Sequence, residues 1–357
     1  MPIPMTLIPL LLLAALALTG CGSTPVKDEG PRPGTSRAGA SSGPSQGSFL
    51  NNPAAQQFID RMVTKGFDRA ELTRTLGRAE RKQWIIDEMD RAAPRPSDRP
   101  TGSWTRYRAK FLTQANISSG AAFWDRNAAT LARAEAQYGV PAQFIVGILG
   151  VETRWGAYMG KTRIIDALAT LAFDYPRRSA YFTGELEQFL VMTRDEGIDP
   201  FQPVGSFAGA MGLGQFMPGS FHKWAVDFDG DRHRNLWDVE DAIGSVANYF
   251  ASHGWRRGEP VAVPARAANA VATKAGFDTR YSLASLQAEG ITPVNAVTTP
   301  GEVSLLRLDV GTGYDYWIGF HNFYVITRYN HSTNYAMAVY QLGQAIKARR
   351  GTGAGSV

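Results

Sequence analysis

The sequence contains one cysteine, Cys21, in 357 residues, so an intrachain disulfide is excluded. It contains no run of more than two consecutive lysines or arginines, although the formal net charge is +5. A positive charge that is spread along the chain favours a membrane surface or an acidic polymer as the partner and disfavours nucleic acid. With 44% hydrophobic and 19% charged residues, the composition is that of a globular protein with enough material for a sizeable core.

The first 20 residues have the character of a signal peptide. The apolar run Leu7–Leu18 has no charged side chain and is too short to span a bilayer well. It ends in Leu18-Thr19-Gly20-Cys21, which resembles a bacterial lipobox, where the peptide is cut before the cysteine and acyl chains are added to its thiol and new amine. Three acyl chains would anchor the protein firmly, because each buried methylene contributes about 0.8 kcal/mol.

We therefore expect lipidation at Cys21 and attachment to a membrane. A plain secretory signal with a chance cysteine is the alternative, and the start lacks the usual Lys or Arg. By the usual sorting pattern of lipoproteins, Gly22 after the cysteine indicates the periplasmic face of the outer membrane. Residues 21–50 are rich in Gly, Pro, Ser and Thr and cannot bury enough apolar surface to fold, so we interpret them as a flexible tether.

Residues 51–140 carry apolar side chains at helical spacing, which predicts an N-terminal helical region. Asp68 is placed to cap one of its helices, with Glu71 three residues further on. A further helix is predicted from about Ala121 to Tyr138.

The next helix is predicted from Ala142 to about Thr153, with Pro141 well placed at its start. Phe144, Ile148 and Glu152 fall four residues apart, which puts the carboxyl group on the buried face. Burial disfavours the charged form and raises the pKa, as a general acid requires near neutral pH. A core glutamate paired with an arginine would give the same pattern.

From residue 256 to 325 the character of the chain changes. β-Branched and aromatic residues lie between Gly and Pro turns in the stretches Val261–Val263, Val303–Val310 and Tyr316–Val325. This composition predicts a small β-containing domain. The helical pattern returns from Ser332 to Lys347.

One acidic loop has the ligand spacing of an EF-hand. Asp227, Asp229 and Asp231 occupy loop positions 1, 3 and 5. The backbone carbonyl of His233 would be the ligand at position 7. The loop departs from the common pattern at position 6, which is Arg232 instead of Gly, and at position 12, which is Asp238 instead of Glu. The spacing predicts a stabilising Ca²⁺ site, because only one helix pair is evident; an acidic surface loop is the alternative.

The glycine-rich stretch from Gly209 to Gly214 invites comparison with a phosphate-binding loop. No Lys-Ser/Thr pair follows it and no strand clearly precedes it, so the sequence disfavours a nucleotide site. Tight turns, or a backbone that approaches a bulky sugar closely, explain the glycines better.

Four segments together resemble the motifs of one enzyme family. Glu152-Thr153-Arg154-Trp155-Gly156 is similar to the Glu-Ser/Thr-x-x-Gly signature of lytic transglycosylases and goose-type lysozymes, and Gly209–Pro218 resembles their second motif. Tyr175–Arg178 and Arg328–Tyr335 match a narrower group. The chain thus resembles the membrane-bound lytic murein transglycosylase B family, glycoside hydrolase family 103, over roughly Asn52 to Lys347.

The resemblance implies an α+β, mainly helical fold with a lysozyme-like core. We expect the catalytic core in residues 141–255, with the helical region 51–140 before it and the small β-containing insert 256–325 after it. A C-terminal helix in residues 326–350 would complete the groove.

The resemblance also implies an enzyme, a carbon–oxygen lyase that cleaves the bond between N-acetylmuramic acid and N-acetylglucosamine in the glycan strands of peptidoglycan. Glu152 first donates a proton to the glycosidic oxygen and then, as a carboxylate, takes the proton of the muramyl 6-hydroxyl. That hydroxyl closes onto C1 and gives a 1,6-anhydro end, helped by the high effective molarity of an internal nucleophile. No acid in the matching motifs supplies the second carboxylate of ordinary glycosidases.

Matching positions suggest roles for the neighbouring residues. Hydrogen bonds to Glu152 or to the sugar are implied for Ser206 and Gln215, and a contact with an acetamido group for Asn330. The groove would be lined by Tyr249, Tyr329 and Tyr335. Arg177 and Arg178 would bind carboxylate groups of the peptide or of the lactyl substituent. In this family the calcium loop runs longer, so Asp241 matches the closing carboxylate, with Asp238 as substitute.

Two other functions stay open at this point. A hydrolase of the same polymer would use water in place of the 6-hydroxyl and leave reducing ends. A non-catalytic scaffold would bind peptidoglycan in the same groove, but the intact motif at Glu152 argues against it.

Overall fold

The computed structural model describes residues 49–91, 101–267, 271–297 and 301–353. The predicted signal peptide, Cys21 and all but the end of the predicted tether lie outside the described residues. The fold is mainly helical. The α-helices are α1 Pro53–Thr64, α2 Arg69–Arg78, α3 Gln83–Arg91, α4 Ser103–Ala109, α5 Gln114–Arg126, α6 Ala128–Tyr138, α7 Ala142–Thr153, α8 Ile164–Asp174, α9 Ser179–Asp195, α10 Pro218–Trp224, α11 Val239–Ser252, α12 Leu283–Ala288, α13 His321–Tyr329 and α14 Thr333–Gly353.

The strands are short and form two antiparallel sheets. They are β1 Thr162–Arg163, β2 Val204–Gly205, β3 Ala262–Ala267, β4 Ile291–Pro293, β5 Ser304–Asp309 and β6 Tyr314–Gly319. β1 pairs with β2, and the second sheet has the order β4-β3-β6-β5. A small apolar core of its own, which includes Leu286, Ile291 and Ile318, supports the second sheet.

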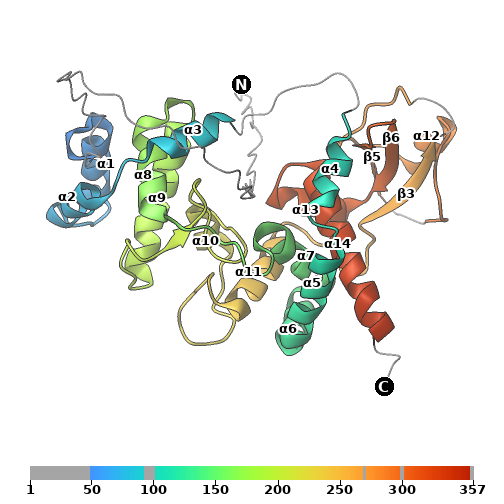
Figure 1. Cartoon of the computed structure of the whole chain (residues 1–357), viewed down its shortest axis with the longest axis horizontal. Helices are drawn as coiled ribbons and strands as arrows, with labels where there is room; N and C mark the ends of the chain where they lie inside the picture. The colour runs from blue at the N-terminus through green and yellow to red at the C-terminus, as the bar shows by residue number, and fades with distance from the viewer. Residues whose placement is uncertain (1–48, 92–100, 268–270, 298–300, 354–357) are drawn as a thin grey trace, which may run out of the picture.

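The molecule is elongated, with α1 and α2 at one end and the second sheet with α12 at the other (Figure 1). At the first end, α1 to α3 lie beside α8 and α9. The side chain of Asp68 caps α2 by accepting a hydrogen bond from Glu71 N at 2.8 Å, which confirms the predicted cap. Apolar side chains of α1, among them Phe58 and Met62, are fully buried at this end.

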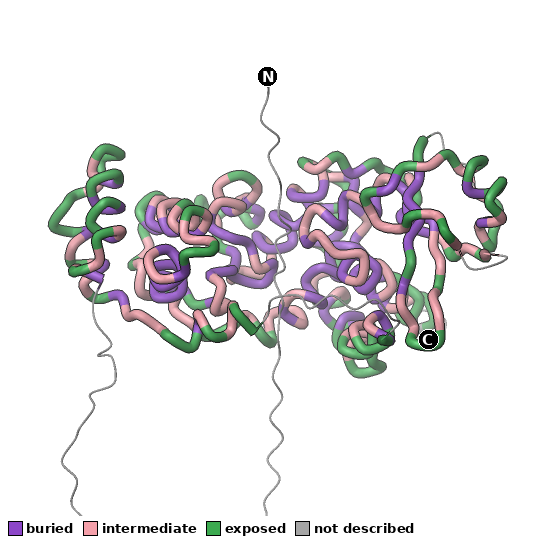
Figure 2. Tube along the Cα trace, turned by 90° about the horizontal axis from the view of Figure 1, so that it is seen from above, coloured by how far each residue is buried: buried purple, intermediate pink, exposed green. Residues whose placement is uncertain are grey.

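The middle of the molecule is built around α7, which packs against α5, α6, α11 and α14. Every residue of α7 except Glu152 is buried, and the helix has the bounds that its apolar spacing predicted. Buried backbone runs through the interior of both halves of the molecule, and exposed backbone lies at the periphery (Figure 2). The site therefore sits on a helix that the surrounding helices fix on all sides.

Two sequence predictions of local structure are wrong. The helix expected from Ala121 to Tyr138 is two helices, because the chain breaks at Asn127, whose φ of −114° is not helical and whose side chain donates to Phe123 O. The predicted β stretch Tyr316–Val325 is a strand only up to Gly319, and α13 begins at His321. Aromatic and β-branched residues are compatible with both a strand and a buried helix. Here Phe323 and Ile326 are buried at helical spacing, which favours the helix.

Within the described residues, no helix is both long enough and apolar enough to cross a membrane.

Candidate active site

Glu152 is the one half-buried side chain of a buried helix, and it lies one residue before the end of α7. The chain leaves the helix through Arg154 and Trp155, which both adopt left-handed backbone conformations at φ 48° and 57°. Such conformations are strained in residues other than glycine and persist only where the surroundings hold them. Here Trp155 donates from its backbone N to Leu149 O and from its indole to Val146 O, which fixes the chain just after the carboxyl group.

A buried tyrosine holds the carboxyl group of Glu152. The hydroxyl of Tyr335, near the start of α14, donates to Oε1 of Glu152 at 2.5 Å. Burial raises the pKa of Glu152 to about 7, and this hydrogen bond opposes the rise because it favours the charged form. The group therefore gains and loses its proton near neutral pH.

Two further tyrosines surround the same carboxyl group. Burial raises the pKa of Tyr107 and of Tyr329, and the negative charge of Glu152 raises both further. The rings of Tyr329 and Tyr335 are nearly parallel, with centroids 6.5 Å apart. The carboxyl group thus lies close to three phenol rings, contributed by α4, α13 and α14.

Sequence reasoning missed Tyr107. It lies on α4, outside all the motifs, and reaches Glu152 only because α4 packs against α14. The one available signal was the helical spacing of Trp104, Tyr107 and Phe111, which indicates an apolar helix face but no catalytic role.

The glycine-rich stretch folds into tight turns beside these tyrosines. The hydroxyl of Tyr329 donates to Gly214 O at 2.5 Å, and a Cβ at Gly214 would lie 2.9 Å from that hydroxyl. At Gly212, where φ is 66°, a Cβ would lie 2.2 Å from Leu236 O. Close approach of the backbone to its neighbours therefore explains these two glycines.

Two polar side chains that the resemblance placed near the sugar hold the loop backbone. The hydroxyl of Ser206 accepts a hydrogen bond from Ala210 N at 2.9 Å. Gln215, at a positive φ of 52°, donates to Met159 O at 3.2 Å and to Gly212 O at 2.9 Å. These bonds join the glycine-rich stretch to the loop that follows Glu152.

Of the other predicted contact residues, two lie beside Tyr329 and two lie in another part of the fold. Tyr249 is buried on α11, donates to Arg328 O at 2.6 Å and packs on Tyr329 with ring centroids 4.8 Å apart. Asn330 is buried at the end of α13, next in sequence to Tyr329. Arg177 and Arg178 lie elsewhere, in the 3-10 helix Pro176–Arg178. Arg177 pairs with Asp90 at 3.3 Å, and the guanidinium group of Arg178 covers the ring of Tyr181.

The acidic loop brings three carboxylates together. Oxygen atoms of Asp227, Asp229 and Asp241 lie within 4.8 Å of one another. Asp241 is buried and accepts from Phe228 N at 2.6 Å and from Asn235 N at 2.7 Å, so both ends of the loop are fixed to it. Burial raises the pKa of Asp241, and the charge of Asp229 raises it further. A bound cation would remove that repulsion, and carboxylate oxygens are the donors that Ca²⁺ prefers.

Asp238 is the N-cap of α11 and is therefore not free to act as the closing ligand of the loop. Its side chain caps α11 by accepting from Glu240 N at 2.7 Å and from Asp241 N at 3.3 Å. Of the two candidates for the closing carboxylate, the geometry therefore favours Asp241. Arg232, at the position where an EF-hand has glycine, adopts a φ of 78° and so carries the strain that glycine would avoid.

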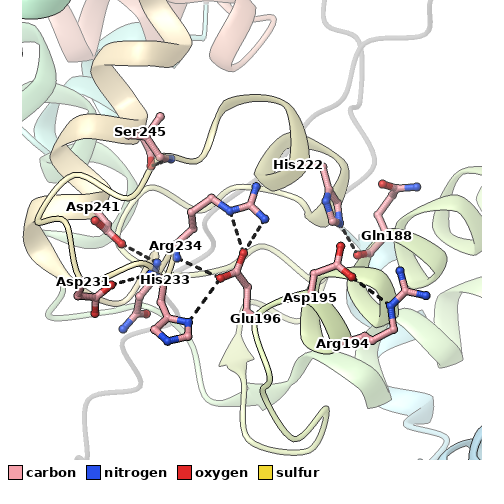
Figure 3. Close-up of polar contacts among 12 residues, drawn as sticks. Gln188, Arg194, Asp195, Glu196, His222, Asp231, His233, Arg234, Asp241 and Ser245 are labelled. Carbon is pink, nitrogen blue, oxygen red and sulfur yellow. Dashed lines mark hydrogen bonds and ion pairs between the residues drawn. The ribbon is translucent and has the colours of Figure 1, made fainter.

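An ion pair holds the end of the acidic loop. Glu196, just after α9, lies between the side chains of Arg234 and His233 (Figure 3). Its carboxylate accepts from Arg234 Nε at 2.8 Å and lies 3.9 Å from Nδ1 of His233. Asp231 accepts from His233 N at 2.7 Å, which tightens the turn before this pair.

The family model described as Transglycosylase SLT domain matches residues 51–344. The chain belongs to this transglycosylase family. The transglycosylase is 58% identical over 309 residues, 85% of each chain, to Membrane-bound lytic murein transglycosylase B of Escherichia coli (strain K12). These matches confirm the family that the four motifs indicated, and with it an enzyme of the lytic transglycosylase kind.

Solved structures give the same result for the fold. The E. coli lytic transglycosylase SLT35, 58% identical, aligns over 85% of this chain and 96% of its own, with TM-scores of 0.81 in its complex with bulgecin A and 0.80 in its complex with calcium. SltB3 from Pseudomonas aeruginosa, solved with NAG-anhNAM-pentapeptide, is 30% identical and aligns over 82% of this chain and 78% of its own with a TM-score of 0.72. The predicted lysozyme-like, mainly helical fold of the transglycosylase is confirmed.

Proposed function

We propose that the enzyme cleaves the glycan strands of peptidoglycan without water, with Glu152 acting first as the acid and then as the base. The observation that carries this proposal is a half-buried carboxyl group with a pKa of about 7, held by Tyr335. Such a group is protonated often enough to give its proton to the glycosidic oxygen and basic enough to take one back. After the proton has left, the hydrogen bond from Tyr335 stabilises the carboxylate.

The second half of the reaction uses the substrate's own hydroxyl group. The Glu152 carboxylate takes the proton of the muramyl 6-hydroxyl as that oxygen bonds to C1, which gives a 1,6-anhydro end. An ordinary glycosidase would need a second carboxylate roughly 5–9.5 Å from the first. No acid in the motifs that match the family fills that role, which supports a scheme with one acid. SltB3 was solved with a ligand that contains an anhydro sugar, which supports the same product.

Mass spectrometry of the fragments released from purified sacculi tests this proposal against a hydrolase. Anhydro ends are expected, and the signal should disappear in Glu152→Gln. Reducing ends in the released fragments would instead assign the hydrolytic reaction.

We further propose roles for the residues around the carboxyl group. The groove for the sugars is lined by Tyr107, Tyr329 and Tyr335, with Tyr249 supporting Tyr329 from behind. Loop contacts to the sugar come from the segment that carries Ser206 and Gln215, and from Asn330 beside Tyr329. Carboxylates of the peptide stems pair with the exposed Arg177 and with Arg178. The core of this arrangement is residues 141–255, completed by the C-terminal part 326–350.

We propose that Asp227, Asp229, Asp231 and Asp241, with the backbone carbonyl of His233, hold a structural Ca²⁺ ion. The support is the convergence of three carboxylates and the complex of SLT35 with calcium. The ion would neutralise the loop and thereby hold the start of α11, the helix that carries Tyr249.

We propose that the enzyme is attached by lipid at Cys21 to the periplasmic face of the outer membrane. The support is the lipobox-like segment and the printed name of the E. coli relative, which is membrane-bound. Metabolic labelling with a fatty-acid analogue tests the anchor: label should enter the wild type and be absent from Cys21→Ser.

A further inference from the structure

Three of the exposed large apolar side chains lie on segments that meet at one short pair of strands. Among the described residues, four large hydrophobic side chains are more than a third exposed: Trp84 at 47%, Tyr158 at 48%, Val204 at 37% and Val294 at 39%. The first three lie around the pair β1–β2, and the fourth follows β4 in the distant sheet. Exposed aromatic rings that lie near one another on a soluble protein can mark an interaction surface.

Three segments of the chain build this surface. Trp84 on α3 contacts Phe207, with ring centroids 6.4 Å apart and planes at 60°. Phe207 follows β2, whose Gly205 pairs with Thr162 of β1. The loop with Tyr158 packs directly on β2, since a Cβ at Gly160 would lie 2.0 Å from Gly205 O. Figure 1 shows α3 beside α8, the helix that starts right after β1.

The surface is continuous with the catalytic loops. Tyr158 is in the loop that leaves α7 just after Glu152, and its backbone N donates to Thr153 O at 2.9 Å. Phe207 is next in sequence to Ser206 of the glycine-rich segment. Gln215 joins the two loops through its bond to Met159 O. The loop that follows Glu152, the glycine-rich segment and α3 are thus joined to one another by these contacts.

The chemistry of the surface fits a sugar chain that carries acidic substituents. The face of an aromatic ring is apolar and electron-rich, so it packs on the C–H groups of a pyranose while the hydroxyl groups stay in water. Two guanidinium groups lie on aromatic rings of these segments: Arg154 is 5.2 Å from the ring centre of Tyr158, and Arg78 is 4.1 Å from that of Phe201, which precedes β2. A lipid surface would favour a broad apolar patch, whereas the exposed rings here are few and one of them carries a cation on its face.

We infer that Trp84, Phe207 and Tyr158 form an outer binding surface for the glycan strand, beyond the sugars that flank Glu152. This inference rests on the proposed function in so far as the polymer is peptidoglycan. It adds that residues outside the family motifs, above all Trp84 on α3, select long strands over short fragments. Trp84 acts as a binding residue that holds the strand and takes no part in proton transfer.

Binding of the polymer is measured by co-sedimentation with purified sacculi, in the Glu152→Gln background so that the polymer stays intact. Trp84→Ala should weaken binding roughly tenfold, because the apolar contact of one aromatic ring with the strand is lost. Trp84→Phe should retain most of the binding, because it keeps a flat ring. Val294→Ala, the exposed apolar residue of the other sheet, is the matched control and should bind as the parent does.

Turnover separates an outer surface from the catalytic centre. With Glu152 intact, Trp84→Ala should lower kcat/KM on sacculi and leave turnover of a peptidoglycan tetrasaccharide unchanged. Unchanged binding to sacculi, or an equal loss of activity on the tetrasaccharide, would overturn the inference. So would a loss of binding by Trp84→Ala to vesicles of phosphatidylethanolamine and phosphatidylglycerol with sacculi binding intact, because the surface would then contact lipid.

A separate measurement tests the proposed acid/base role of Glu152. If Glu152→Gln alone still releases soluble fragments at the rate of the wild type, the role of Glu152 is wrong, whatever Trp84 does. Binding of Trp84→Ala relative to its parent still tests the outer surface in that case, and Trp84→Phe, which keeps a ring beside Phe207, controls for loss of that packing contact.

Discussion

The hydroxyl of Tyr335 lies 2.5 Å from Oε1 of Glu152 and donates a hydrogen bond to it. The bond joins the start of α14 to the end of α7, across 183 positions of sequence. Burial alone would push the pKa of the carboxyl group higher, and this bond pulls it back toward about 7. Two opposing effects, one from the whole core and one from a single tyrosine, therefore set the proton affinity of the site.

Glu152→Gln should abolish most of the activity, because glutamine can neither donate nor accept the proton. General acid–base catalysis contributes roughly 10²–10⁴-fold, so release of soluble fragments from sacculi should fall by at least that range. Glu185→Gln is the matched control: burial also raises the pKa of Glu185, but its carboxylate accepts from Gly219 N and Tyr181, not from Tyr335. Equal clearance of sacculi by Glu152→Gln and wild type would remove Glu152 from the mechanism.

Glu152→Gln, which should lower activity, should raise the thermal stability of the folded protein at alkaline pH. The pKa of Glu152 is about 7 in the folded protein against 4.5 in an unperturbed glutamate, so between these values the folded state holds more protons than the unfolded state. Folded stability is therefore lost as the pH rises from about 4.5 to about 7. Glu152→Gln should melt above the wild type at pH 8 and close to it at pH 4. A lower melting temperature of the variant at pH 8 would contradict the raised pKa.

Tyr335→Phe should move the pH profile of activity. Loss of the hydroxyl removes the bond that lowers the pKa of Glu152, so the pKa rises. The first step needs the protonated acid, so the alkaline limb of kcat/KM should shift to higher pH than in the wild type. The measurement is the pH dependence of peptidoglycan turnover by both proteins. An alkaline limb that stays in place, or moves to lower pH, would show that Tyr335 does not tune the acid.

Added Ca²⁺ should raise the melting temperature of the enzyme, as expected for a ligand that binds only the folded state. Asp229→Ala should abolish this shift, because Asp229 is one of the three converging carboxylates. Asp238→Ala should lower the melting temperature by removing the cap of α11 but keep the shift, because Asp238 caps the helix and Asp241 is the proposed ligand. If Asp238→Ala loses the Ca²⁺ shift as well, the two aspartates have been assigned the wrong way round.

Local patterns predicted those features that depend on neighbouring residues. The bounds of α7 follow from Pro141 and from the apolar spacing, and the cap of α2 follows from Asp68 and Glu71. The junction of β6 and α13 could not be predicted, because the aromatic and β-branched residues there suit a strand as well as a buried helix.

The site depends on packing that no local pattern contains. Glu152 was predicted from its motif and from its place on the buried face. Its contact with Tyr335 requires α7 and α14 to pack side by side, and Tyr107 comes from a helix that the motifs do not include. The resemblance supplied Tyr335 as a groove residue, but its hydrogen bond to the acid is visible only in the fold.

Asp309 in the β-containing part holds the helix that carries Tyr107. Its carboxylate accepts from the backbone N–H groups of Thr101, Gly102 and Ser103 at 2.8, 2.9 and 3.1 Å, and the last two are at the start of α4, where N–H groups have no partner within the helix. The pKa of Asp309 lies well below its ordinary value: burial opposes this, and the hydrogen bonds from these N–H groups outweigh it. The distant sheet thus contributes to the pocket of Glu152 through one side chain.

Asp309→Ala should therefore lower the melting temperature and also lower kcat/KM, because α4 loses its cap and Tyr107 loses its fixed place beside Glu152. Tyr107→Phe separates the two effects: it keeps α4 capped, so its melting temperature should stay closer to the wild type. The measurement is thermal unfolding together with turnover of the peptidoglycan tetrasaccharide. Full activity of Asp309→Ala below its melting range would show that the β-containing part does not position the catalytic pocket, and that Asp309 only stabilises the contact between β5 and α4.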